Sequence, residues 1–191
     1  DLLPHLDKPH IVDADCQDME ALFSRIADEF IDIRPGRLLS IPLATRATVT
    51  SRNLISGGIS YSNGGGDFGL RMKTAGYDAV VLRRASPQPV YLLLGTNGPE
   101  LLPAGELWGL TISDLRTRLD QLYPDSERGF IGIGPAGENQ ARIACLMVDR
   151  AHAAGWGGSG AIFGAKKLKA VVALKQTAVQ VGIENTQLKA E

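Results

Sequence analysis

Two glycine-rich stretches are the parts of this sequence best suited to chemistry. They cover residues 57–69 and 155–164 and hold many of the chain's 22 glycines. Glycine lets the backbone approach a ligand closely, because no Cβ stands in the way. Backbone N–H groups in such loops, followed by the start of a helix, bind anions well. The two stretches therefore predict a cradle for phosphate or for a phosphorylated cofactor.

The other residues with chemical potential do not form a self-contained catalytic site. Residues 132–137 fit Gly-x-Gly-x-x-Gly, but Pro135 lies inside the turn and a lone match of this kind is weak. Cys16 and Cys145 are the only cysteines, so the chain cannot supply the four ligands of a zinc site or an iron–sulfur cluster. Cys145 lies in an apolar stretch and is expected to be a buried, inert thiol.

The composition indicates a chain that can build a hydrophobic core and carries little net charge. Of its 191 residues 44% are hydrophobic, and the formal net charge is −1. The absence of a Lys/Arg-rich block argues against nucleic acid or an anionic membrane as the partner. The longest apolar runs, such as residues 90–94, are far shorter than the roughly 20 residues of a membrane-spanning helix. With no visible signal peptide and only two cysteines, the expected location is the cytoplasm.

The elements that would position the glycine stretches follow from hydrophobic periodicity and turn residues. Residues 1–17 are expected to form an arm, and residues 184–191 a frayed tail. Thr111 and Asp114 have the spacing of a capping box and open a helix. Strands over 79–83 and 90–94 are expected to form a hairpin. The other expected elements are a helix over 19–30, strands within 38–55, a short helix over 70–76, a loop over 95–105, a strand over 130–133, a helix over 139–154, and strands over 169–174 and 179–183.

The surroundings of the two glycine stretches resemble each other. The recurring segments are Phe68-Gly69 and Ala79-Val80-Val81 in the first half, and Phe163-Gly164 and Ala170-Val171-Val172 in the second. Such repetition predicts an ancient duplication. The halves would cover about 40–95 and 130–183, superpose through these segments and bring both glycine stretches close to a pseudo-twofold axis. Chance similarity between two glycine-rich loops is the alternative.

Two segments closely resemble the signature of the aldehyde ferredoxin oxidoreductase family. They begin at Ser62-Asn63-Gly64-Gly65-Gly66-Asp67-Phe68-Gly69 and at Ile133-Gly134-Pro135-Ala136-Gly137-Glu138-Asn139, and the second continues through Gly155-Trp156-Gly157-Gly158-Ser159-Gly160 to Ala170. The resemblance covers about residues 40–175. It implies that residues 18–183 form one α+β domain with two related β-sheets and flanking helices, arranged about a pseudo-twofold axis.

The resemblance also implies a cofactor. Family members hold tungsten, sometimes molybdenum, between two pterin dithiolenes whose phosphates meet at a bridging magnesium ion. The residues here that match cofactor-contacting positions are Arg46, Asn63, Gly64, Gly65, His152, Ala153 and Gly155. Asn63 matches the position near the bridging magnesium. The family's cluster cysteines and catalytic pocket residues lie in later domains, so no catalytic residue is expected in this chain.

Two residues depart from the family pattern on the second side of the site. His152 stands where the family usually has an arginine, and Trp156 where many members have another. Losing an arginine next to phosphate removes charge-assisted hydrogen bonds worth about 1.5–3 kcal/mol each. Histidine replaces only part of this charge at neutral pH. Trp156 is expected to fill the space that the cofactor takes in relatives, with stacking on a pterin or a protein partner as the alternative. We therefore expect weak cofactor binding by this chain alone.

The function implied is that of a domain or subunit of an aldehyde ferredoxin oxidoreductase-type enzyme, without its iron–sulfur and catalytic parts. Such a chain is not expected to oxidise aldehydes by itself. Its expected partners are a second copy, a catalytic homologue or an iron–sulfur subunit. One alternative is a degenerate, non-catalytic subunit that acts as a scaffold or assembly partner without the metal cofactor. Another is an α+β domain that binds a different small anion.

Overall fold

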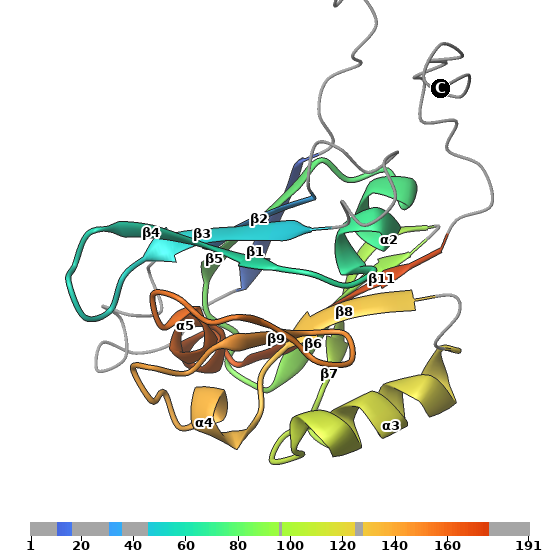
Figure 1. The fold of residues 1–191 in the computed structure, drawn as a ribbon. Coiled ribbons are helices and arrows are strands. Elements are labelled where there is room, and N and C mark those ends of the chain that lie inside the picture. Colours follow the sequence, from blue (N-terminus) through green and yellow to red (C-terminus); the bar gives the residue numbers. More distant parts are fainter. Residues whose placement is uncertain (1–10, 17–30, 36–45, 96, 125–127, 176–191) are drawn as a thin grey trace, which may run out of the picture.

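Two β-sheets stacked face to face form the frame of the molecule (Figure 1). The computed structural model describes residues 11–16, 31–35, 46–95, 97–124 and 128–175. In spatial order the first sheet contains β4 (Ile59–Gly64), β3 (Ala47–Arg52), β2 (Ile31–Pro35), β5 (Ala79–Arg84) and β1 (Ile11–Cys16). The second contains β10 (His152–Ala154), β9 (Leu146–Val148), β8 (Arg128–Gly132), β11 (Leu168–Leu174), β6 (Val90–Gly95) and β7 (Gly98–Pro103). The helices are α2 (Phe68–Thr74), α3 (Ile112–Leu122), α4 (Pro135–Glu138) and α5 (Ser159–Ala165). The expected α+β fold with two sheets is confirmed.

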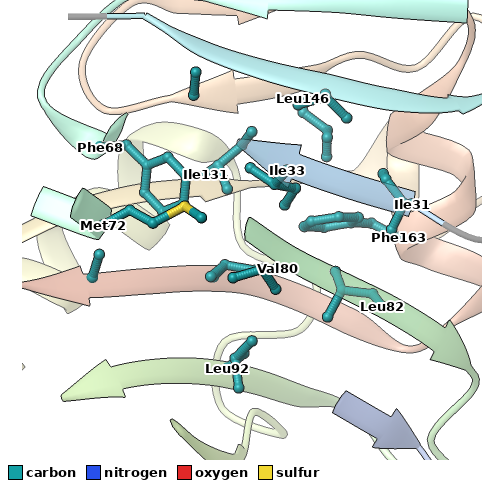
Figure 2. Packing of buried hydrophobic residues seen from close by; sticks show 14 of the residues in the cluster. Ile31, Ile33, Phe68, Met72, Val80, Leu82, Leu92, Ile131, Leu146 and Phe163 are labelled. Atoms are coloured by element: carbon teal, nitrogen blue, oxygen red, sulfur yellow. The ribbon is translucent and has the colours of Figure 1, made fainter. Parts of the chain in front are cut away.

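The main core lies between the two sheets. Residues of β3 alternate between buried and less buried positions, because successive side chains of a strand point to opposite faces. Phe68 and Met72 of α2 and Phe163 of α5 are fully buried and pack with the inward side chains of the strands (Figure 2). The strand residues labelled in this core are Ile31, Ile33, Val80, Leu82, Leu92, Ile131 and Leu146.

A smaller core lies on the other face of the second sheet, under α3. Leu115 and Leu119 of this helix pack with Phe130 of β8. The helix begins as predicted, because Thr111 Oγ1 accepts a hydrogen bond of 3.2 Å from the backbone N–H of Asp114. Within the part of the chain that the structure describes, no helix is long and apolar enough to cross a membrane.

The two sheets share one topology. Counted from the edge where they meet, β4, β3, β2, β5 and β1 correspond to β10, β9, β8, β11 and β6. Neighbouring strands are antiparallel in both sheets, except that β5 is parallel to β1 and β11 is parallel to β6. Helix α2 connects β4 to β5, as α5 connects β10 to β11. Strand β7 is an addition to the second sheet.

The register of the strand pairs corresponds as well. The equivalent pairs are Ala47–Gly64 and Leu146–Ala154, Val49–Ser62 and Val148–His152, Ile33–Val80 and Ile131–Val171, and Val12–Val80 and Leu92–Val171. A left-handed residue also follows each helix, Gly76 with φ 94° and Lys167 with φ 56°. Matching order, direction and register support the predicted duplication, whereas descent from one ancestral half stays a prediction.

One detail of the predicted repeat is wrong. A Cβ on Gly69 would lie 2.8 Å from the carbonyl oxygen of Arg46, and a Cβ on Gly160 would lie 2.5 Å from that of Cys145. Gly69 therefore lets α2 pack closely against the residue before β3. Gly160 in the same way lets α5 pack closely against the residue before β9. Gly69 thus corresponds to Gly160, and Phe163-Gly164 lies one helical turn further on. The two Ala-Val-Val segments do occupy equivalent positions in β5 and β11.

The predicted hairpin of strands 79–83 and 90–94 is also wrong. These segments form β5 and β6, which belong to different sheets. β5 pairs with β1 and β2, while β6 pairs with β11 and β7. Residues 85–89 carry the chain from one sheet to the other. The first half therefore ends before β6, and the expected loop over 95–105 contains β7.

The predicted helix over 139–154 is replaced by two short strands. α4 ends at Glu138, and β9 and β10 follow. Positive φ angles at Gln140 (56°) and Asp149 (49°) interrupt helical geometry on both sides of β9. The second glycine stretch, expected as a loop, contains α5. Cys145 is half-buried rather than part of the core.

The amino-terminal and carboxy-terminal expectations are tested only in part. Ile11–Cys16, within the expected arm 1–17, forms β1 and pairs with β5. The expected helix over 19–30, the strand over 179–183 and the tail 184–191 lie outside the described residues.

Candidate functional site

The two glycine stretches meet where β4 lies beside β10. A Cβ on Gly64 would lie 2.4 Å from Cγ2 of Val148, so only glycine lets these edge strands approach so closely. Two further contacts join the halves here. The backbone N–H of Trp156 donates to Ser62 Oγ (3.1 Å), and the ring of His152 lies against Gly65, whose Cβ would be 2.9 Å from Nδ1.

The structure brings the predicted site residues together around this contact. Arg46 directly precedes β3, whose first residue is paired with Gly64. Arg46 and Asn63 from the first half are exposed, and so are the second-half residues His152, Ala153 and Gly155. Gly65 is half-buried. Gly64 is buried against β9 and β10, where the packing requires glycine, and its contact with a cofactor stays a prediction.

Asn63 is held by a neighbour that the sequence did not reveal. Thr48 lies opposite it in β3, and the Thr48 hydroxyl donates to Asn63 Oδ1 at 2.7 Å. This bond fixes the Asn63 amide with its Oδ1 toward Thr48. A magnesium ion would need the oxygen that Thr48 already contacts. No group of three His, Cys, Asp or Glu that could hold a metal exists among the described residues, and the magnesium role stays a prediction.

Asp149 is a second residue of the site that sequence reasoning missed. It lies in the turn between β9 and β10, three residues before His152. Its carboxylate accepts backbone hydrogen bonds from Asp67 (2.6 Å), Phe68 (2.9 Å) and Phe130 (2.8 Å). Burial raises the pKa of Asp149, and these three donors act in the opposite direction. From the sequence, Asp149 falls inside the predicted helix over 139–154. An aspartate recognised in a turn would have been a stronger candidate for a site residue.

The two sides of the site differ in charge and polarity. By the strand register, the residue equivalent to Arg46 is Cys145, whose sulfur lies 3.8 Å from that of Met147. A guanidinium on the first side is thus matched by neutral sulfur side chains on the second. Trp156 is 68% exposed. Its exposed ring is compatible with either expectation, so the prediction that it fills the cofactor's space stays a prediction.

Comparison with known proteins settles the family. A model of the aldehyde ferredoxin oxidoreductase N-terminal domain matches residues 31–175. This chain belongs to the aldehyde ferredoxin oxidoreductase family. The tungsten-containing aldehyde ferredoxin oxidoreductase of Pyrococcus abyssi is 37% identical over 142 residues, which are 74% of this chain and 23% of that protein. The enzyme of the same name from Thermococcus kodakarensis is 38% identical over 141 residues, 73% of this chain and 23% of that protein.

Two further matches carry other names. The WOR-like subunit of an aliphatic sulfonate oxidoreductase from Pyrococcus furiosus is 34% identical over 153 residues, covering 74% of this chain and 24% of that protein. Among solved structures, the active-site complex BamBC of benzoyl coenzyme A reductase, in complex with 1,5-dienoyl-CoA, matches with a TM-score of 0.73 and 28% identity. That match covers 79% of this chain and 23% of the other. The chain spans about a quarter of the length of the relatives that it matches.

Proposed function

We propose that this chain forms the pterin-facing part of an aldehyde ferredoxin oxidoreductase-type enzyme. The observation that supports it best is the contact between the halves: Gly64 and Gly65 pack against Val148 and His152. The exposed candidate residues are chain neighbours of this contact, namely Arg46, Asn63, Ala153 and Gly155. In the proposal, a tungsten or molybdenum bis-pterin cofactor with a bridging magnesium ion lies over the contact between β4 and β10.

The residues present fit such a group on the first side better than on the second. Arg46 carries a planar guanidinium suited to phosphate, and Asn63 presents amide donors suited to phosphate or a pterin edge. Above Gly155 no atom lies within 4 Å of where a Cβ would stand, so the backbone there is open to a ligand. When bound, the metal–pterin group supplies the electron transfer. The residues of this chain hold and orient it.

The remaining parts of the enzyme would come from polypeptide beyond these residues. Relatives are about four times as long as the matched segment. Two cysteines cannot bind a four-cysteine cluster, so we expect an iron–sulfur subunit or a catalytic homologue as the partner, in the cytoplasm. Without such a partner the chain is expected to show no aldehyde oxidation with a viologen acceptor.

Replacing Arg46 with glutamine tests the proposed site. We expect cofactor affinity to fall by about tenfold to a hundredfold, because a charge-assisted hydrogen bond to phosphate is lost. The measurement is tungsten and molybdenum content of protein purified from its source cells. The matched control is Arg118→Gln, which removes an exposed arginine of α3 that pairs with Glu106. Equal metal content in both variants and in the wild type would contradict the proposal.

Replacing Gly155 with alanine tests cofactor binding at a position where the substitution should hardly change the stability of the fold. The new methyl group meets no protein atom within 4 Å, and the φ of Gly155 lies outside the left-handed region. The free energy of unfolding should therefore change by no more than about 0.5 kcal/mol. The methyl group would, however, stand where the cofactor approaches the backbone, so metal content should fall. Gly105→Ala, also in open space, is the control and should leave metal content unchanged.

One observation favours the second candidate function, an assembly partner without the cofactor. The five most exposed large hydrophobic residues of the described chain are Ile55, Ile59, Tyr61, Ile143 and Trp156. Their segments contact one another: the backbone N–H of Leu54 donates to the carbonyl of Gly157 at 3.2 Å, and a Cβ on Gly158 would touch both Leu54 and the backbone of Arg142. Exposed apolar clusters of this kind mark interaction surfaces. Protein from source cells that lacks tungsten and molybdenum but remains bound to a longer family member would favour this function.

A further inference from the structure

The start of α2 is capped by a side chain from the other half of the molecule. The helix begins after Asp67, which makes no side-chain capping bond, and its first turn has no acidic residue. Instead, the backbone N–H groups of Asp67 and Phe68 both donate to Asp149 Oδ2, at 2.6 and 2.9 Å. Oδ1 of the same carboxylate accepts from Phe130 in β8 at 2.8 Å. One carboxylate therefore ties a first-half helix to a second-half strand.

The same carboxylate determines the shape of the first glycine loop. Gly66 has φ 95°, and a Cβ there would lie 2.5 Å from Asp149 Oδ2 and 3.3 Å from the His152 ring. The loop thus closes directly onto the turn that contains Asp149. Because His152 follows that turn and its ring lies against Gly65, the turn contacts the loop at two successive residues.

This arrangement changes the expected role of α2. The glycine stretch followed by a helix start predicted an anion site, but an internal anion already occupies the first N–H groups of this helix. A ligand phosphate at the same place would meet the negative charge of Asp149. Phosphate must therefore be bound elsewhere on the surface, by groups such as Arg46 and Asn63.

We propose that Asp149 is a positioning residue: by accepting the N–H groups of Asp67 and Phe68, it holds Gly64–Gly66 against the second half in the shape that the cofactor surface requires. Asp149 does not itself touch the cofactor. The proposal rests on the proposed function for what the surface binds. The geometry of the loop, in contrast, can be tested without any ligand.

The first test is Asp149→Asn in the full chain, followed by NMR relaxation of backbone amides. Asparagine keeps the shape but has one acceptor oxygen, so its NH2 group must face the N–H of Phe130 or those of Asp67 and Phe68. We expect the order parameters of Gly65 and Gly66 to fall from the rigid range, about 0.85, toward about 0.6. The control is Leu119→Val or Leu119→Ala, whichever matches the Tm of the asparagine variant, because Leu119 is buried under α3 away from the site.

Unchanged order parameters in Asp149→Asn, or an equal fall in the Leu119 control, would overturn the positioning role.

The second measurement is tungsten and molybdenum content of the same variants from source cells. We expect Asp149→Asn to hold at least tenfold less metal than the Leu119 control of equal stability. Equal metal content would overturn the role in the site. A wild type without metal, together with a loosened loop in Asp149→Asn, would end the proposed function and leave the structural role of Asp149 standing.

Discussion

Replacing Lys169 with methionine is expected to lower the free energy of unfolding by about 3–5 kcal/mol, the usual cost of breaking one side of a buried ion pair. Lys169 in β11 has no exposed side-chain surface and pairs with Glu138 of α4, which is 6% exposed. Its ammonium also donates to the carbonyl of Leu110 at 2.9 Å. Methionine would leave the buried Glu138 side chain without its ammonium partner, while the backbone N–H of Gly109 still donates to it.

The double variant Lys169→Met with Glu138→Gln distinguishes the pair's attraction from the cost of leaving one charge alone. Burial lowers the pKa of Lys169 even though Glu138 raises it, so loss of solvation exceeds the attraction within the pair. We therefore expect the double variant to recover most of the loss. Urea unfolding of the wild type, the single variant and the double variant measures these differences in the free energy of unfolding. A double variant as unstable as the single one would contradict the explanation.

Gly164→Ala is expected to destabilise the fold although alanine favours helices. A Cβ at this position in α5 would lie 1.9 Å from the carbonyl oxygen of Gly137 and 2.8 Å from its carbon. Both are backbone atoms of α4, so they cannot move aside as a flexible side chain would. Overpacking of this kind costs about 1–3 kcal/mol and sometimes more, which exceeds the gain of about 1 kcal/mol in helix propensity.

Thermal unfolding of Gly164→Ala should show a Tm several degrees below that of the wild type. Gly105→Ala is a suitable control, because no atom lies within 4 Å of its Cβ position. Since Glu138 directly follows Gly137, a displaced α4 should also disturb the pair with Lys169. A variant as stable as the wild type would mean that the two helices do not approach as closely as described.

Local sequence signals predicted local structure well and long-range pairing badly. Thr111 capped its helix as expected, because the cap depends only on residues within one turn. The strands at 79–84 and 90–95 were also recognised, but their partners lie far away in sequence, and adjacency suggested a hairpin that does not exist. Leu146 and Val148 fall within the predicted helix over 139–154, although they alternate in β9, because short apolar segments fit either period.

For the candidate site too, sequence signals identified individual residues but not the long-range contacts that hold them. The family resemblance identified Gly65 and His152, which the fold brings into contact. It did not identify Thr48 or Asp149, which act on site residues through hydrogen bonds that span 15 and 82 positions of the chain. The equivalence of Arg46 and Cys145 was equally hidden, since it depends on strand register rather than on sequence similarity.

We propose that this chain provides one face of a metal–pterin site and that longer polypeptide completes it. The most direct test is the tungsten and molybdenum content of the chain purified alone, compared with the chain purified together with the proposed iron–sulfur partner from the same source cells. We predict stoichiometric metal in the complex and far less than one metal per chain in the isolated protein. Stoichiometric metal in the isolated chain, or none in the complex, would contradict this account.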